Sequence, residues 1–130
     1  GCGTAILAIL AAKMKAAQVY GIDIDAIAAI SAYDNARKNR VGKVIETYCG
    51  DASLLQRNSY DVLLANINRN ILIADMGNFC KVMKHGTTLI ISGFYEEDIP
   101  LLLEEASKHD LNETRHVVEN NWTCIVLTYK

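Results

Sequence analysis

Apolar residues occur along the chain in two patterns, one with helical spacing and one in short continuous runs. Apolar spacing of about three to four residues predicts helices, and short apolar runs bounded by polar turns predict strands. We expect helices over residues 5–14, 69–84 and 98–109, and one that begins after Asp25 and extends to about Arg40. We expect strands over 19–22, 44–48, 60–65 and 87–92, and a hairpin of 111–119 and 122–129 around Asn120-Asn121.

Particular residues predict the ends and the buried faces of these elements. Asp25 is the expected N-cap of the second helix, with Ile27 and Ile30 facing the core. Asn58-Ser59 is expected to form the turn before the third strand, and His85-Gly86 to end the third helix. The apolar residues at helical spacing are Ile6, Leu7, Leu10 and Met14 in the first helix, and Leu72, Met76, Phe79 and Met83 in the third.

The order of these elements predicts an α/β domain that spans residues 1–130. Strands that alternate with helices favour a mostly parallel sheet covered on both faces, followed here by the C-terminal antiparallel hairpin. The formal net charge of -2 argues against a surface built mainly to bind nucleic acid. The longest uninterrupted apolar run, 5–12, is far shorter than the roughly 20 residues that a membrane helix needs.

Four cysteines are scattered along the chain at positions 2, 49, 80 and 124. They form no Cys-x-x-Cys pair, and none lies near a histidine at zinc-ligand spacing. We therefore expect no metal site and interpret the cysteines as buried free thiols in a reducing cytoplasm.

Candidate ligand-binding residues follow the strands, because open α/β sheets bind ligands at the carboxyl ends of their strands. Gly1-Cys2-Gly3-Thr4 opens the first helix, where backbone N–H groups are free to meet a ligand. The acid Asp23 ends the next strand and can accept two hydrogen bonds from a ribose diol. Gly50-Asp51-Ala52 follows another strand and could meet an adenine amino group, and Asn66 follows the strand after it.

Each of these polar residues also has an ordinary structural interpretation. Asp23 could cap a helix, and Asp51 and Asn66 could be turn residues. Their joint position at one edge favours a nucleoside ligand, which could be part of a dinucleotide or of S-adenosyl-L-methionine. The dinucleotide motif needs a third glycine where this chain has Ile6, and the C-terminal hairpin is foreign to that fold. Both observations favour the methyl donor.

Six short segments of the chain form a distinctive set, namely Gly1-Cys2-Gly3-Thr4, Gly21-Ile22-Asp23-Ile24-Asp25, Asp34-Asn35-Ala36, Gly50-Asp51-Ala52, Ala65-Asn66-Ile67 and Ile91-Ser92-Gly93-Phe94. Together they resemble the PrmA family, whose members methylate protein eleven of the large ribosomal subunit with S-adenosyl-L-methionine. The resemblance implies a Rossmann-like class I methyltransferase fold. It also implies that a ribosomal protein is the partner. We expect no direct binding of nucleic acid, no association with a membrane, and a location in the cytoplasm.

The resemblance assigns a role to each candidate residue. Gly1 and Gly3 would line the methionine part of the donor, and Asp23 would hold its ribose hydroxyls. Asp51 and Ala52 would lie beside the adenine, and Asn66 would orient the acceptor amine with its side-chain carbonyl. Three residues are also expected to bind the donor, namely Cys2, Ile24 and Asn66, the last of them beside the reacting methyl group. The acceptors implied are lysine side chains and an N-terminal α-amine.

The resemblance also implies that residues 1–130 are part of a longer protein. The family places its first strand before the glycine loop and carries a separate N-terminal domain. We therefore expect that this piece alone neither methylates its target nor folds well unaided.

The Asn-Pro-Pro-aromatic motif, typical of enzymes that methylate nucleic-acid base amines or glutamine, is absent, and its absence argues against those substrates. An RNA or small-molecule acceptor, and a nucleoside-binding module without turnover, remain the alternatives.

Overall fold

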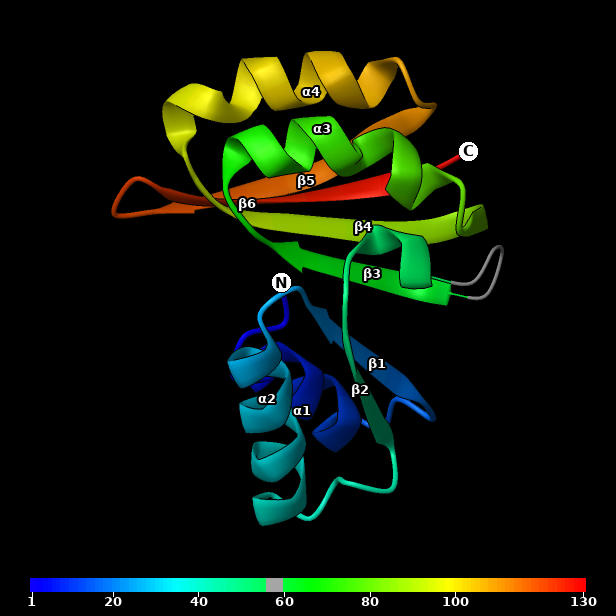
Figure 1. Cartoon of the computed structure of the whole chain (residues 1–130). Helices are drawn as coiled ribbons and strands as arrows, with labels where there is room; N and C mark the ends of the chain where they lie inside the picture. Colours follow the sequence, from blue (N-terminus) through cyan, green and yellow to red (C-terminus); the bar gives the residue numbers. More distant parts are fainter. Residues whose placement is uncertain (56–59) are drawn as a thin grey trace. The chain divides into compact units, whose positions relative to one another are not determined.

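The computed structural model describes residues 1–55 and 60–130 (Figure 1). The chain divides into two compact units, residues 1–54 and 55–130, and each unit is described by itself. The turn predicted at Asn58-Ser59 lies outside the described residues. The single domain expected over residues 1–130 stays a prediction.

Unit 1 is a parallel pair of strands packed against two helices. Its elements are α1 (Ile6–Lys13), β1 (Val19–Asp23), α2 (Ala26–Lys38), β2 (Ile45–Cys49) and the short 3-10 helix η1 (Ala52–Leu54). Strands β1 and β2 run in parallel, with Gly21 opposite Thr47 and Asp23 opposite Cys49. This parallel register brings the residues that follow the two strands to the same edge of the unit.

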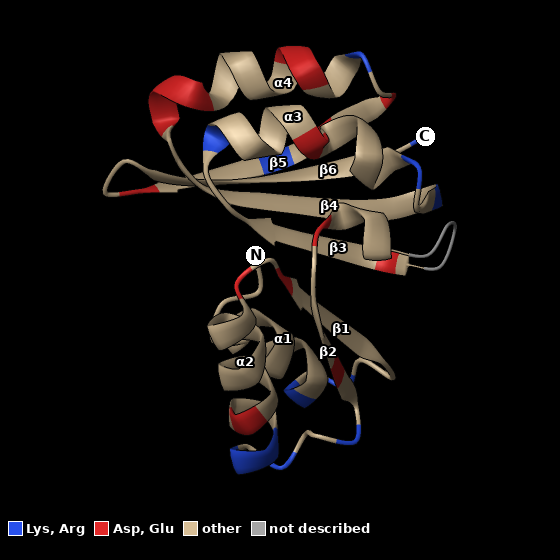
Figure 2. Cartoon of the chain, viewed as in Figure 1, with Lys and Arg blue, Asp and Glu red and all other residues tan. Residues whose placement is uncertain are grey.

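Local chemistry determines both ends of α2. The Asp25 carboxylate accepts a hydrogen bond from the Ile27 N–H at 2.9 Å, so the predicted N-cap is confirmed. Arg37 and Lys38 occupy the last turn, where positive charge is favourable to the helix dipole. In Figure 2 these basic residues lie at the opposite end of α2 from the chain's N-terminus.

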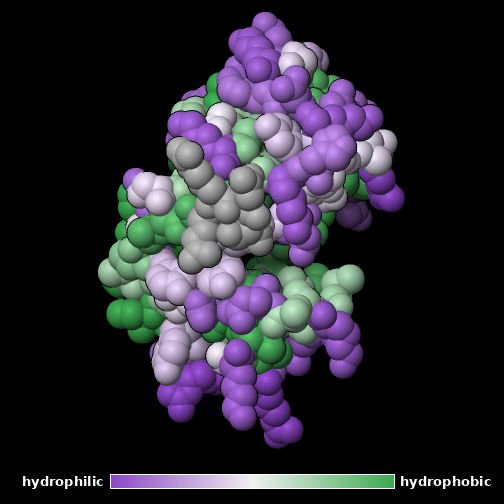
Figure 3. Space-filling view, turned by 90° about the vertical axis from the view of Figure 1, so that its right-hand side faces the viewer, coloured by the Kyte–Doolittle hydropathy of each residue, from purple (hydrophilic) through white to green (hydrophobic). Residues whose placement is uncertain are grey.

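The buried face of unit 1 differs from the one predicted. Ile27 and Ile30 were expected to face the core, but their side chains are 75% and 62% exposed. Small residues fill the core in their place, namely Ala5, Ala8, Ala12, Ala32, Ala36 and Ile45. Both helices carry alanine and larger apolar residues on several faces, so apolar spacing alone selects no single buried side. The large residues consequently add to the hydrophobic areas of the surface, some of which are visible as green in Figure 3.

Unit 2 is a four-stranded mixed sheet with two helices. The elements are β3 (Tyr60–Asn66), α3 (Arg69–Cys80), β4 (Met83–Tyr95), η2 (Glu96–Asp98), α4 (Ile99–Ser107), β5 (Leu111–Glu119) and β6 (Trp122–Tyr129). Strand order is β3-β4-β6-β5; β3 and β4 are parallel, whereas β6 is antiparallel to both β4 and β5. Figure 1 shows α3 and α4 side by side on one face of the sheet.

The third helix ends earlier than the sequence pattern predicts. Leu72, Met76 and Phe79 are buried on α3 as expected, but Met83 belongs to β4. Gly86 therefore lies inside a strand and ends no helix. The buried Thr87 hydroxyl explains the difference, because it accepts from the Lys84 N–H and donates to the Tyr60 carbonyl, which holds this segment against β3.

The C-terminal hairpin agrees with the prediction. Strands β5 and β6 pair antiparallel from Leu111 opposite Tyr129 to Glu119 opposite Trp122. Asn120 and Asn121 have φ angles of 50° and 68°, as the preferred two-residue hairpin turn requires. The predicted α/β class, with parallel strands and a C-terminal antiparallel hairpin, is confirmed. No helix in the described ranges is long and apolar enough to cross a membrane.

Candidate functional site

The glycine loop of unit 1 is bound to the end of β1 by its own backbone. The Cys2 N–H donates to the Ile22 carbonyl at 2.8 Å. Gly3 has a φ of +54°, and nothing lies within 4 Å of the place where its Cβ would be. The positive φ and this open space let a ligand approach the Gly3 backbone closely.

Asp23 is held in place by two backbone N–H groups. Its Oδ2 accepts from Gly3 N at 2.8 Å, and its Oδ1 accepts from Asp25 N at 2.9 Å. The pKa of the Asp23 carboxyl lies below its ordinary value, first because of the hydrogen bond from Asp25 and also because of that from Gly3. A carboxylate has about four acceptor positions, so each oxygen keeps one for a ligand hydroxyl.

The residues after β2 meet Asp23 at the same edge. Gly50 N donates to the Asp23 carbonyl at 2.8 Å, which places Asp51 directly beyond this contact. The Ser53 side chain and its backbone N–H lower the pKa of the exposed Asp51 carboxyl. Ala52 begins η1. The structure thus brings Gly3, Asp23 and Asp51 together within unit 1.

Two other predicted donor-binding residues differ in how they could contribute. Ile24 is 77% exposed directly after Asp23, so its side chain is free to pack against a flat base. The Cys2 side chain lies under the loop, where its Sγ is 3.3 Å from the place that a Cβ on Gly21 would take. Burial, and then the charge of Asp23, raise the pKa of the Cys2 thiol. Cys2 therefore supports the loop by packing.

Asn66 belongs to unit 2, and its position relative to the residues of unit 1 is not determined. It is the last residue of β3 and pairs in register with Ser92 of β4. Its amide is exposed, and in residues 1–55 and 60–130 it has no hydrogen-bond partner. An unpaired amide at a strand end is free to bind a ligand.

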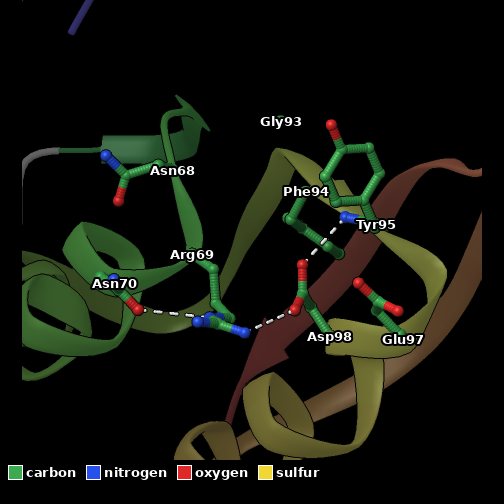
Figure 4. Close-up of a pocket in the computed structure, with 8 residues that line it drawn as sticks. All are labelled: Asn68, Arg69, Asn70, Gly93, Phe94, Tyr95, Glu97 and Asp98. Atoms are coloured by element: carbon green, nitrogen blue, oxygen red, sulfur yellow. Dashed lines mark hydrogen bonds and ion pairs between the residues drawn. The ribbon is translucent and has the colours of Figure 1, made fainter.

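A pocket of about 390 Å³ lies close to Asn66 in the same unit (Figure 4). The buried Asp98 carboxylate accepts from Arg69 Nη1 at 2.8 Å and from Tyr95 N at 3.0 Å. The lining residues are Asn68, Arg69, Asn70, Gly93, Phe94, Tyr95, Glu97 and Asp98.

Sequence reasoning did not identify this pocket. Arg69 opens α3, and its guanidinium pairs with the buried Asp98 carboxylate. The pair joins residues 29 positions apart, so no local pattern predicts it. The one sequence clue is Gly93, which belongs to a segment quoted for the family resemblance. Among the described residues, no cluster of histidine, cysteine and acidic side chains is arranged to hold a metal ion.

Sequence comparison relates the whole chain to one family. The family model described as ribosomal protein L11 methyltransferase (PrmA) matches residues 1–130. A protein of that name from Porphyromonas gingivalis is 46% identical over 131 residues, which cover 98% of this chain. Its namesake from Bacteroides thetaiotaomicron is 39% identical over 129 residues and covers 99%. The chain spans about half the length of these relatives, with 44% and 46% of their sequences covered.

Solved structures confirm the predicted Rossmann-like methyltransferase fold. Ribosomal protein L11 methylase from Lactobacillus delbrueckii subsp. bulgaricus superposes with a TM-score of 0.94 at 22% identity, covering 100% of this chain and 67% of that one. An RNA methyltransferase from Salinibacter ruber, solved with S-adenosyl-L-homocysteine, has a TM-score of 0.79 at 18% identity and covers 100% and 78%. At such identities these structures show the fold alone. The sequence match over residues 1–130 shows more, namely that the chain belongs to the PrmA family of ribosomal protein L11 methyltransferases.

Proposed function

We propose that residues 1–130 are the S-adenosyl-L-methionine-binding, catalytic part of a longer protein N-methyltransferase that acts on ribosomal protein L11 in the cytoplasm. The observation that carries the proposal is the Asp23 carboxylate at the carboxyl end of β1. Both of its oxygens are oriented by backbone N–H groups, and both keep an acceptor position for the hydroxyls of a ribose. Family membership and the lengths of the relatives support the rest.

In this proposal different residues of unit 1 bind the methionine, ribose and adenine parts of the donor. The Gly1 and Gly3 backbone lines the methionine part, and Asp23 accepts from the two ribose hydroxyls. Asp51 and Ala52 lie beside the adenine, and the exposed Ile24 packs against its face. Cys2 holds the loop from beneath. The described residues thus offer a ribose acceptor, an open backbone and an apolar surface within one short stretch of edge.

Asn66 has a different task, the orientation of the acceptor amine. Its side-chain carbonyl would accept a hydrogen bond from the amine and so direct the nitrogen lone pair. S-Adenosyl-L-methionine supplies an activated methyl group, so alignment is the main contribution required of the protein. The nitrogen forms a bond to the methyl carbon as the carbon–sulfur bond breaks, and the amine proton leaves to water. We propose lysine side chains and an N-terminal α-amine as the acceptors.

Calorimetric titration tests the donor site in the full-length polypeptide that contains these residues. We expect S-adenosyl-L-homocysteine to bind with micromolar affinity and NADH not to bind. Asp23→Ala should weaken binding about tenfold or more, because two hydrogen bonds to a charged acceptor are lost. Asp34→Ala, which removes an exposed acid from the middle of α2, is the matched control and should leave binding unchanged. Binding of NADH alone would contradict the proposal.

Methyl-transfer assays separate the proposed acceptor from the alternatives. We expect radioactive methyl groups on ribosomal protein L11 and none on RNA. A basic surface for RNA along α3 is not favoured. Arg69 at the start of α3 pairs with Asp98, and Lys84, which follows the end of α3, pairs with Asp61. Asn66→Ala should reduce methyl transfer and keep donor affinity within about threefold. A protein that binds the donor but methylates neither acceptor would be a nucleoside-binding module.

A further inference from the structure

We propose that Gly93 is a positioning residue that holds the Asn66 amide in its orientation toward the acceptor. The proposal rests on the function proposed above for Asn66. Gly93 follows Ser92 in β4, and Ser92 is the residue that pairs with Asn66 across the two parallel strands. The lack of a side chain at position 93 would therefore be part of the catalytic arrangement.

The close approach of Gly93 to the β3–α3 turn carries the argument. A Cβ at position 93 would lie 3.0 Å from Asn66 Oδ1, 3.2 Å from the Ile67 carbonyl oxygen and 3.4 Å from Ile67 N. Real Cβ atoms almost never come nearer than the first of these distances. The Oδ1 atom is also the one that would accept from the amine. Any side chain at this position would thus press on the atom that matters for orientation.

Hydrogen bonds on both sides of the contact restrain the backbone of β4 at Gly93 and of the β3–α3 turn, so neither can easily move aside. The register of β4 against β6 shifts between Ser92 and Phe94, and Gly93 has a φ of +93° at this irregularity. Asp98 joins the end of β4 to the start of α3, because its carboxylate accepts from Tyr95 N and from Arg69 Nη1 (Figure 4). The Asn68 side chain accepts from Ile71 N at 3.0 Å and caps α3. The Asn66 side chain is the softer element and would give way.

This geometry predicts an effect on turnover that leaves the donor site intact. Gly93→Ala should push the Asn66 Oδ1 aside by a few tenths of an ångström. A misplacement of about 1 Å can reduce the rate about a hundredfold, so this smaller shift should reduce it by up to about tenfold. The residues proposed to bind the methionine, ribose and adenine parts of the donor belong to unit 1, and Gly93→Ala changes none of them. We therefore expect kcat to fall about fivefold to tenfold, while the Kd for S-adenosyl-L-homocysteine changes by less than about threefold.

Gly86 provides a matched control within the same strand. Its φ is +90°, close to that of Gly93, but nothing lies within 4 Å of the place of its Cβ. Gly86→Ala therefore introduces the same backbone strain without the contact. We expect it to lower stability and to leave kcat within about twofold of the wild-type value. Equal loss of kcat in both variants would show that strain, and not the contact with Asn66, causes the effect.

A double-mutant cycle in the full-length polypeptide tests whether Gly93 acts through Asn66. If it does, Gly93→Ala should change kcat by less than about threefold when Asn66 is already alanine. An undiminished loss in the Asn66→Ala background would overturn the proposal. Should Gly93→Ala fail to fold, Gly93→Asn serves in its place, because asparagine tolerates positive φ better and adds the same Cβ.

An NMR measurement decides the proposal independently of enzyme activity. The side-chain amide signals of Asn66 are assigned from their loss in Asn66→Asp. Gly93→Ala should shift these signals, whereas Gly86→Ala should leave them in place. Unshifted signals in Gly93→Ala would overturn the positioning role even in an active enzyme. Wild-type protein without methyl transfer, or Asn66→Ala with full activity, would contradict the proposed function while the NMR result still decides the role of Gly93.

Discussion

At the scale of single residues, the donor-site hypothesis depends on how Asp23 is held. A carboxylate that only capped a helix would use one oxygen for a local N–H. Asp23 accepts from Asp25 locally and from Gly3, twenty positions away, with its other oxygen. The second hydrogen bond joins the glycine loop to the strand end. Only the folded structure shows this hydrogen bond, although the spacing of Gly3 and Asp23 in the sequence is consistent with it.

Acid titration should reveal this arrangement of Asp23. Its pKa is lower in the folded chain, so its contribution to the free energy of unfolding is complete above the ordinary value of about 3.9 and declines as pH falls through the lower folded pKa. Urea unfolding of wild type and Asp23→Asn between about pH 2.5 and 6 measures this contribution. The difference between their free energies of unfolding should shrink toward low pH, and it should be small at every pH because Asp23 is largely solvated. A difference that grows with acidity would contradict the assignment.

The cysteines correct a sequence expectation at the same scale. All four were expected to be buried, but Cys49 is exposed and the other three are partly buried. Burial, and then the charge of Asp110, raise the pKa of Cys80 to about 11. Cys49 is the last residue of β2. The order of apolar and polar residues along this short strand did not indicate which of its side chains meet solvent.

Alkylation with iodoacetamide at pH 8 checks this difference. We predict that Cys49 reacts first and Cys80 last, because only about one part in a thousand of a thiol with a pKa near 11 is ionised at that pH. Mass spectrometry after a series of reaction times gives the order. In urea all four should react at similar rates. Early labelling of Cys80 in the folded protein would contradict the described burial.

At the scale of elements, boundaries with local causes were predictable and those with distant causes were not. The Asp25 cap and the Asn120-Asn121 turn depend on neighbouring residues, and both are confirmed. The end of α3 depends on the contact of Thr87 with Tyr60, which lies 27 positions away. Apolar spacing through Met83 therefore predicted a longer helix than the one that forms.

The hairpin turn offers a test at this scale. Asn120 has a φ of 50°, which alanine adopts at a cost of about 1 kcal/mol and glycine at almost none. Asn120→Ala should therefore lower the free energy of unfolding by about 1 kcal/mol relative to Asn120→Gly. Chemical denaturation of the two variants measures the difference. The comparison at one position removes the effect of losing the side chain, and equal stabilities would contradict the turn geometry.

At the scale of the whole molecule, the exposed apolar residues of unit 1 matter most. Ile6, Met14 and Ile27 are each more than 70% exposed. Large exposed apolar patches mark interaction surfaces or sites of aggregation. Since the relatives are about twice as long as this chain, further sequence is available to cover such residues in proteins of that length.

We predict that a 130-residue polypeptide is less stable than the full-length protein and does not methylate ribosomal protein L11. Dye binding to exposed apolar surface should be stronger for the short chain, and its thermal unfolding should begin at a lower temperature. Purification of both under the same conditions, followed by the methyl-transfer assay, provides the comparison. A short chain that is compact, stable and active would contradict the prediction.

The sequence by itself determined the kinds of element, their order and the residues that follow each strand. Helical spacing, turn residues and caps act over a few positions, so they can be read without knowing the fold. Family membership likewise follows from the order of short motifs such as Gly50-Asp51-Ala52. Only the tertiary structure decided that alanines form the core of unit 1, that Arg69 meets Asp98 and that Gly93 lies against Asn66. These contacts join positions far apart in the chain, and their energies depend on distances that local patterns do not contain.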